Sequence, residues 1–380
     1  MRASLWTSAF VRSVLARDAA AGRVALGANS RHNFIANSTF RIAQRQAPAS
    51  VTTYSNTSGR SYGPDRWGLT NENASMAFQR VNTATTPETG YQGRFYGGFL
   101  KVTSAGKIIV SQALETNDCM TLRGRKVRLQ FKGKIGSGSY TLRCCLLQLT
   151  SAGSVNQIPA TFVSAFGSGS TDPTWGTNLS AITPDTANLN TSISGSGLSC
   201  ALASGWTLFG GTFTCPSDFR NLVVVIFSDT QIGVGDFFYL GEVGLFDGEE
   251  QRPFIPTRFD EDLALCQKYC CKTFATESAP VQNAGTGTGE HRWVATQAGA
   301  VVQKSPTWSF PVRMRLAPTV TVYSPNAASA QAYDQDAAQA CTATTTNNVT
   351  DRGLNVHATG HATTAVGNYI AAHFLCEAEI

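Results

Sequence analysis

Charged side chains are scarce in this sequence: Asp, Glu, Lys and Arg make up 14% of its 380 residues, against about a quarter in average globular domains. Helical blocks rich in Ala, Glu, Lys and Leu are missing after the extreme N-terminus, which argues against a helical bundle. The 30 basic and 25 acidic residues are scattered, so no nucleic-acid partner is indicated. No apolar run reaches the length of a membrane span, and Arg12 and Arg17 interrupt the first apolar stretch. We therefore expect neither membrane insertion nor an export signal.

Motifs for catalysis are missing as well. The sequence contains no GxSxG, no HExxH and no glycine loop of the kind that cradles phosphate, and its five histidines lie in no known catalytic context. Two carboxylate pairs have structural explanations, because Glu249 and Glu250 belong to a predicted turn while Asp260 and Asp262 begin a predicted helix. We expect a protein that is not an enzyme, with no catalytic residue and no cofactor.

The cysteines follow neither a metal-binding nor a disulfide spacing. There are ten of them, no CxxC pair occurs, and the vicinal pairs 144–145 and 270–271 lie inside apolar runs. Such cysteines are typically small buried hydrophobic residues. Cys200 and Cys215 flank a predicted hairpin and are candidates for a disulfide, but we expect free thiols, as suits folding in a reducing cytoplasm.

What the sequence does contain is a series of short apolar segments separated by turn residues. Between residues 33 and 256 no helix is expected, and this pattern predicts a jelly-roll β-sandwich. The stretch 167–205 is rich in Gly, Ser, Thr and Asn, and we interpret it as a long loop, a place where function often resides. The strand candidates are 76–81, 98–104, 107–114, 126–134, 141–150, 207–215 and 222–229.

A second unit begins after the strand predicted at 237–243, which carries apolar residues on both faces. Pro253 and Pro256 end the sheet, since neither has an N–H to donate. The acidic residues 260–262 then favour a short linker helix over 260–273. Five further strand candidates follow, so residues 257–380 are predicted to form a C-terminal β-sandwich domain. These candidates are 291–297, 307–316, 318–324, 353–360 and 369–380.

The first 32 residues differ from the rest. Trp6, Phe10 and Val14 recur at helical spacing with arginines between them, which predicts an amphipathic basic helix. One interpretation is an ordinary helix that packs on its own domain. The other, which we favour because no adjacent helix is expected to cover the stripe, is a docking element that inserts into a virion partner or bundles with its own copies.

Aromatic residues in polar loops are the candidates for ligand binding, because sugar rings stack on flat apolar faces. Trp175 lies in DPTWGTN and Tyr91 in ETGYQGR, and each also has a structural interpretation as an anchor beneath its own loop. The interpretations are balanced for Trp175, and the structural one is favoured for Tyr91. Asp65, Arg66 and Trp67 form a cluster for which we expect a structural role, with the indole in the core and the charged pair at the loop edge.

The pair His357 and His361 is a weak candidate for a metal site. The two residues are four apart in a strand-like segment, so we expect them on one face. In a homotrimer such residues line the axis and bind a metal, although histidines without a ligand are the commoner case. We therefore predict no metal, with these two residues as the alternative.

Several motifs, taken in order, resemble those of bacteriophage tail-fibre and related virion proteins. They are NFIANSTFRIAQRQ (33–46), YGPDRWGL (62–69), SQALE (111–115), LRGRKVRLQFKGK (122–134), FYLGEVGLFDGEEQRPF (238–254) and DEDLALCQKYCCK (260–272). RMRLAPTVTVY (313–323) and AEI (378–380) resemble the terminal β-domain of such proteins. Phe246 and Asp247 depart from the Leu-Glu of that family, and the first 32 residues match none of its patterns.

The resemblance covers about residues 33–380 and implies a jelly roll like that of carbohydrate-binding modules, a β-rich tip domain and a homotrimer without catalytic machinery. Our leading hypothesis is a tail fibre that is assembled in the host cytoplasm, joins other virion proteins through its N-terminal segment and contacts a host surface glycan. Two alternatives stay open: a head fibre or capsid-decorating spike, and a tailspike enzyme that degrades glycans.

Overall fold

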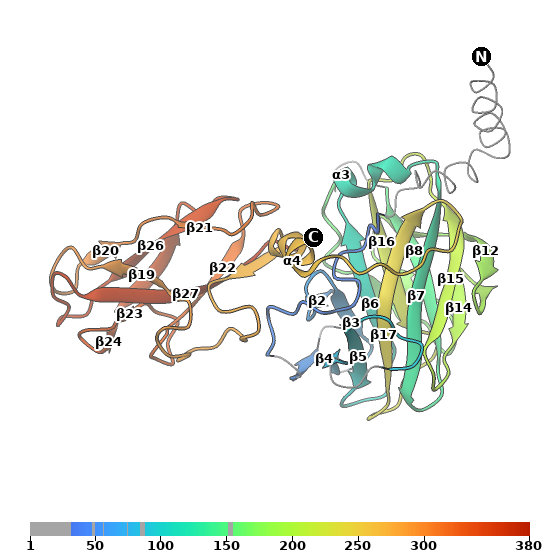
Figure 1. Ribbon diagram of the computed structural model, residues 1–380, viewed down its shortest axis with the longest axis horizontal. Coiled ribbons are helices and arrows are strands. Elements are labelled where there is room, and N and C mark those ends of the chain that lie inside the picture. The colour runs from blue at the N-terminus through green and yellow to red at the C-terminus, as the bar shows by residue number, and fades with distance from the viewer. Residues whose placement is uncertain (1–31, 48–49, 56, 74, 84–87, 151–154) are drawn as a thin grey trace, which may run out of the picture.

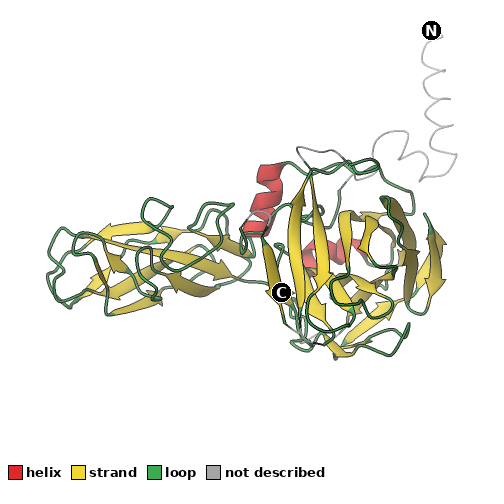
Figure 2. Ribbon diagram, turned by 90° about the horizontal axis from the view of Figure 1, so that it is seen from below, coloured by secondary structure: helices red, strands yellow, loops and turns green. Residues whose placement is uncertain are grey.

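The computed structural model describes residues 32–380 except 48–49, 56, 74, 84–87 and 151–154. Two β-sandwiches lie end to end along the long axis of the molecule, with helix α4 (Phe259–Gln267) between them (Figures 1 and 2). The prediction of a mainly β chain with two sandwiches and a short helix between them is confirmed. The predicted N-terminal helix, with Trp6, Phe10 and Val14, lies outside the described residues. Within the described part, no helix is long and apolar enough to cross a membrane.

The N-terminal sandwich is made of a seven-stranded and an eight-stranded antiparallel sheet. The seven-stranded sheet has the order β1 (Val51–Tyr54), β4 (Met76–Asn82), β5 (Phe95–Lys101), β17 (Phe237–Asp247), β7 (Lys126–Ser137), β15 (Thr207–Thr214) and β12 (Pro184–Asn188). The eight-stranded sheet has the order β13 (Thr191–Ser194), β14 (Gly197–Ala201), β8 (Thr141–Leu149), β16 (Asn221–Ser228), β6 (Ile108–Leu114), β3 (Gly68–Asn71) and β2 (Ser61–Tyr62), and β11 (Leu179–Ile182) also pairs with β8.

The core lies between these two sheets. Phe78, Phe99 and Phe131 from one sheet and Leu146 and Ile226 from the other belong to a single buried cluster. Strands β6 and β16 are buried along their whole length, and the apolar run 222–227 of β16 predicts such burial. Short elements complete this half: α3 (Thr116–Cys119), a 3₁₀ turn (Met120–Leu122), and the two-stranded sheet of β9 (Val163–Ala165) and β10 (Thr174–Trp175).

All seven predicted strands of this half are confirmed, but the interpretation of 167–205 as one long loop is wrong. That stretch contains five strands, β10 to β14. They are short, β12 and β13 are largely exposed or half-buried, and β13 (TSIS) has a single large apolar residue. Hydrogen bonds to neighbouring strands hold them in the sheets, and no apolar alternation marks them in the sequence.

The C-terminal sandwich is organised around two long strands. Strand β27 (Tyr369–Glu377) is the centre of a six-stranded sheet and β26 (Gly353–Thr359) of a four-stranded one. The six-stranded sheet adds β18 (Cys270–Lys272), β19 (His291–Val294), β22 (Thr319–Tyr323), β23 (Tyr333–Asp334) and β24 (Gln339–Ala340). The four-stranded sheet adds β20 (Val302–Lys304), β21 (Trp308–Ser309) and β25 (Ala343–Asn347).

The linker helix is shorter than the sequence predicts. It begins with three acidic residues in its first turn, as expected, but ends at Gln267. Residues 270–272 instead form the strand β18, which is antiparallel to β27, with the backbone of Cys271 opposite that of Cys376. Cys266, Tyr269 and Cys270 are buried packing residues. All ten cysteines are free and buried, which confirms the prediction of free thiols, Cys200 and Cys215 included.

Residues 33–46 run between the two sandwiches and join them. The Asn37 N–H donates to the Asp262 carboxylate of α4 at 2.7 Å, and Arg41 pairs with the same group at 2.9 Å. The Gln44 side-chain amide donates to the Cys270 carbonyl, and Lys272 donates to the Gln44 carbonyl at 2.7 Å. The two halves are therefore linked by buried, directional bonds rather than by the linker alone.

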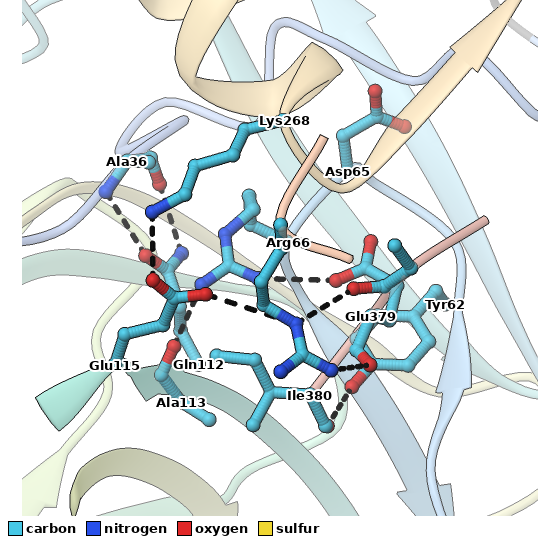
Figure 3. A network of polar contacts seen from close by, with 12 residues as sticks. Ala36, Tyr62, Asp65, Arg66, Gln112, Ala113, Glu115, Lys268, Glu379 and Ile380 are labelled. Carbon is cyan, nitrogen blue, oxygen red and sulfur yellow. Dashed lines mark hydrogen bonds and ion pairs between the residues drawn. The ribbon is translucent and has the colours of Figure 1, made fainter. Parts of the chain in front are cut away.

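The last residues of the chain form the second part of this junction (Figure 3). Glu379 pairs with Arg45 and Arg66, both at 3.1 Å. The Tyr62 hydroxyl donates to the Ile380 carbonyl at 2.7 Å, and the Arg66 guanidinium lies 3.3 Å from the centre of the Tyr269 ring. Segments from both ends of the described chain therefore meet here.

The cluster of Asp65, Arg66 and Trp67 is structural, as predicted. Trp67 is fully buried in the core, and its indole N–H donates to the Asn37 carbonyl at 3.0 Å. Asp65 accepts hydrogen bonds from the backbone and side-chain amides of Gln44. Arg66 does more than the sequence indicates, because it crosses to the C-terminal sandwich instead of remaining at its own loop.

Candidate functional site

The outer face of the eight-stranded sheet is covered. Leu147, Val225 and Phe227 point outward from its strands and pack in one buried cluster with Ile158 and with other residues of the segment 155–182. Tyr269 and Ile380 from the C-terminal half belong to the same cluster. Both faces of this sheet are therefore buried by the protein itself.

A glycine makes this covering segment fit, which gives a testable prediction. A Cβ at Gly176 would lie 1.9 Å from the Thr161 carbonyl oxygen, whereas a Cβ at Gly205 would meet no atom within 4 Å. We expect Gly176→Ala to lower the free energy of unfolding by about 1–3 kcal/mol, as overpacking does. Gly205→Ala should leave it nearly unchanged. Urea unfolding of both variants checks this, and equal midpoints would contradict it.

The outer face of the seven-stranded sheet is covered only in part. The linker after β17 crosses β7, where the side chain of Gln130 exchanges two hydrogen bonds with the backbone of Arg252 at 2.7 and 3.2 Å. Arg128 donates to the Glu249 carbonyl at 2.8 Å. Towards β1 the same face carries a hollow of about 380 Å³. Its lining residues are Val51, Ala77, Phe78, Gln79, Gly98, Phe99, Leu100, Gly235, Phe237 and Tyr239.

Aromatic rings form one wall of this hollow. Phe237 and Tyr239 are both half-buried on β17, and their rings meet edge to face at 5.3 Å. Gly98 is the partner of Tyr239 on β5, and a Cβ there would lie 3.2 Å from the Tyr239 ring. The glycine therefore lets this ring lie close to the sheet, with part of its surface open to the hollow.

Beside the hollow an aromatic group surrounds a lysine. The Lys134 ammonium lies 4.9 to 5.4 Å from the ring centres of Tyr96, Trp206 and Tyr239. Its counter-ion is Glu88, which also accepts hydrogen bonds from the Tyr96 hydroxyl and, at 2.7 Å, from the Trp206 indole. Burial alone would raise the pKa of Glu88, but the hydrogen bonds from Lys134, Tyr96 and Trp206 outweigh burial and lower it.

The charges near the hollow are compensated within the protein. Lys134 pairs with Glu88, and Lys132 pairs with Glu242 at 3.0 Å. The hollow itself is lined by apolar residues and one amide side chain, that of Gln79. Such a surface suits a neutral ligand with an apolar face rather than an anion or a cation.

The two aromatic residues singled out from the sequence are not in this hollow. Trp175 lies on the side of the eight-stranded sheet, half-buried against Phe162 and Phe227 at 5.7 and 5.9 Å. Tyr91 is 9% exposed and stacks on Trp206 at 4.3 Å. Tyr91 is thus an anchor of its own loop beside the aromatic group and not an open platform. The sequence analysis missed Phe237, Tyr239 and Trp206 as candidates.

The expected geometry of His357 and His361 is wrong. Strand β26 ends at Thr359, and His361 lies in the turn that follows, so the two side chains do not share a strand face. A hydrogen bond of 2.8 Å joins the His361 ring and the Thr363 hydroxyl. Within the described ranges, no group of three His, Cys, Asp or Glu residues is placed to hold a metal ion.

No protein-family model matches the sequence, and no curated protein matches it. The enzymatically active domain of tailspike protein 4 of bacteriophage CBA120 matches 57% of this chain and 21% of its own, with 8% identity and a TM-score of 0.32. TmCBM61, solved with β-1,4-galactotriose, matches 57% of this chain and 99% of its own, with 12% identity and a TM-score of 0.31. The CBM22-1 xylan-binding domain of Paenibacillus barcinonensis matches 54% and 99%, with 11% identity and a TM-score of 0.28. At such scores these likenesses assign no site, so the function is argued from this chain's own residues.

Proposed function

We propose that this protein binds a neutral glycan in the hollow on the outer face of its seven-stranded sheet. The observation that carries the proposal is the half-buried aromatic wall of Phe237 and Tyr239 on a sheet face that the protein leaves open. Sugar rings have apolar faces that stack on aromatic rings such as these. The compensated charges nearby favour a neutral sugar over an acidic one.

The wider role that we propose is that of a trimeric phage fibre that attaches to the host surface. It is supported by the ordered virion-protein motifs between residues 33 and 380, and by the elongated pair of sandwiches joined through a bonded junction (Figure 1). In this role the N-terminal segment joins other virion proteins and the glycan belongs to the host cell. None of the residues that line the hollow is a carboxylic acid, whereas glycoside hydrolysis commonly uses a carboxylate pair. The proposal is therefore for binding without cleavage.

Replacing Tyr239 tests the glycan site. We expect Tyr239→Ala to weaken binding about tenfold, because the loss of one stacking ring is worth roughly 1–1.5 kcal/mol. Tyr239→Phe keeps the ring and should keep most of the affinity. Binding is measured on an array of neutral and acidic oligosaccharides, followed by titration of the best neutral ligand.

Trp175→Ala is the matched control, since it removes an aromatic ring on β10, at the other side of the sandwich. Circular dichroism establishes that each variant is folded. Loss of binding in Trp175→Ala with full binding in Tyr239→Ala would place the site on the other side of the sandwich. A wild-type protein that binds only acidic glycans would contradict the neutral ligand.

The oligomeric state tests the fibre. We expect light scattering to give three times the chain mass of 40.5 kDa, because the resemblance to tail fibres implies a homotrimer, and homo-oligomers usually have closed symmetry. The measurement is made over a range of concentrations. A mass of 40.5 kDa at every concentration would contradict the trimer and leave the glycan site untouched.

A further inference from the structure

A second hollow, of about 310 Å³, opens at the junction of the two sandwiches. We call it the junction pocket. Its apolar lining residues are Phe34, Leu114, Leu265 and Tyr269, together with Ala36. At about 30 Å³ per water molecule it has the volume of roughly ten waters, which is ample for a large side chain. It shares no lining residue with the hollow on the seven-stranded sheet.

The polar groups around the junction pocket already have partners within the protein (Figure 3). Gln112 exchanges two hydrogen bonds with the backbone of Ala36 at 2.8 and 2.9 Å. Lys268 pairs with Glu115 at 2.7 Å, and the Arg66 guanidinium rests on the Tyr269 ring. The walls are therefore preformed, and the surface that they leave open is mainly apolar.

The mouth of the pocket combines apolar surface with negative charge. Leu265 is 45% exposed on helix α4. Glu261, one helical turn earlier on the same face, is also exposed. Asp118, another lining residue, has a side chain that is 51% exposed. It lies 3.7 Å from the Lys268 ammonium, which it shares with Glu115, so one cation faces two carboxylates here. A partner that presents apolar residues flanked by basic ones would fit this mouth.

Residues 1–31 of the chain have that chemistry, and their C-terminal end meets the junction pocket. They join the described chain at His32, which lines the pocket and packs edge-on against Phe34 at 4.8 Å. Their sequence places Trp6, Phe10 and Val14 at helical spacing and holds five arginines against one aspartate. Arginine side chains suit the carboxylates at the mouth, and the apolar stripe suits the pocket.

The tether favours the chain's own segment over that of a second copy. Residues 15–31 separate the stripe from His32 and include a Gly/Ala-rich stretch. For a Gly-rich random coil of that length the end-to-end distance is roughly 20–25 Å, and a tether of that reach raises the effective concentration of its end to the millimolar range. A segment from another molecule would need a comparable protein concentration to compete.

We propose that the junction pocket holds the apolar stripe of the chain's own N-terminal segment, with its arginines beside Glu261 and Asp118. The inference is independent of the glycan site. It assigns the segment a resting place in the free protein, from which a virion partner has to displace it. It also gives the apolar side chains of that segment a covered position before assembly.

Cysteine cross-linking of the full chain tests this placement. The variant carries Phe10→Cys and Leu265→Cys and is treated with a short bismaleimide, which spares the ten native cysteines because all are buried. We expect a cross-link within one chain, identified by peptide mapping of the band at 40.5 kDa. The control pairs Phe10→Cys with Ile193→Cys, a position 48% exposed on β13, and should give several-fold less product.

Cross-links between two chains would overturn the proposal, because the pocket would then take a second copy's segment. Equal yields at residues 265 and 193 would overturn it as well. A second measurement needs no cysteine: hydrogen exchange of residues 263–269 is compared between the full chain and a chain that lacks residues 1–31. We expect faster exchange without the segment, and identical rates would refute the docking.

Discussion

Replacing Arg66 by alanine is expected to lower the free energy of unfolding by about 3–5 kcal/mol, the usual cost of removing one partner from a buried ion pair. Arg66 is 4% exposed. Its guanidinium pairs with Glu379 at 3.1 Å, donates to the Ala113 carbonyl at 2.7 Å and rests on Tyr269. All three contacts are lost together, and a cavity is left at the junction.

Backbone strain at residue 66 does not contribute to the measured change in the free energy of unfolding. Arg66 has a φ of +72°, in the left-handed region that side chains with a Cβ adopt at a cost. Alanine also has a Cβ and so keeps that strain unchanged. The loss of stability in Arg66→Ala therefore comes from the side chain alone. Glu379→Gln, alone and combined with Arg66→Ala, completes a double-mutant cycle in which we expect clear non-additivity, since the two groups are in direct contact.

Arg313→Ala is the matched control for Arg66. Arg313 also pairs with a carboxylate, that of Asp351 at 2.5 Å, but its side chain is 68% exposed. An exposed ion pair contributes only about 0–1 kcal/mol. Urea unfolding compares the two variants. If both lose equally little, the junction is not the rigid connection that its bonds indicate, and the two sandwiches unfold independently.

The sequence predicts the sandwiches well because their strands carry local signals. Residues 222–227 of strand β16 are an unbroken run of apolar residues, and the helix start at 260–262 is marked by its acidic turn. Strands β12 to β14 carry no such signal, since they contain few large apolar residues and their neighbours hold them in place. Arg66 shows the same limit for contacts, because its partner Glu379 lies 313 positions away. Local patterns cannot indicate that pairing.

The candidate site was only half visible in the sequence. Residues 237–243 carry apolar side chains on both faces, which indicates that Phe237 and Tyr239 need apolar contacts outside the core that buries Phe238. The sequence does not reveal which face stays open. That depends on the order of strands in the sheet and on the linker that covers β7 but not β5. Trp175 attracted attention because its neighbours are polar, yet it is held by Phe162 and Phe227.

Acidification is expected to destabilise the C-terminal sandwich through His373. The imidazole is fully buried, stacks on Phe274 at 3.9 Å, and has hydrogen bonds to the hydroxyls of Thr273 and Thr288, both at 2.9 Å. Burial disfavours the charged ring and lowers the pKa of His373 from 6.5 to about 4, although the nearby Glu290 carboxylate opposes the shift. The unfolded chain therefore binds a proton in a range where the folded chain does not.

The sign of the effect follows from this difference in proton binding. Stability is intact above pH 6.5 and falls as the pH drops towards 4, by at most about 3 kcal/mol at 1.36 kcal/mol per unit of pKa. Glu290 extends the loss to lower pH. Burial alone would raise the pKa of Glu290, but hydrogen bonds from the Gly287 N–H and the Arg292 side chain outweigh burial and lower it from 4.5 to about 2. Its stabilising contribution is present above pH 4.5 and disappears as the pH falls towards 2.

A series of urea unfolding curves between pH 7.5 and 4 measures the effect of His373, and His373→Gln isolates it. The amide has no proton to gain in this range, so we expect the stability of the variant to fall less steeply with acidification than that of the wild type, whatever its absolute value. His361→Gln is the control, because the half-buried His361 lies in a turn with only a local partner, Thr363. Parallel curves for the wild type and His373→Gln would mean that the buried imidazole already exchanges its proton with solvent near pH 6.5. The two threonine hydroxyls would then stabilise the charged ring as well as the neutral one.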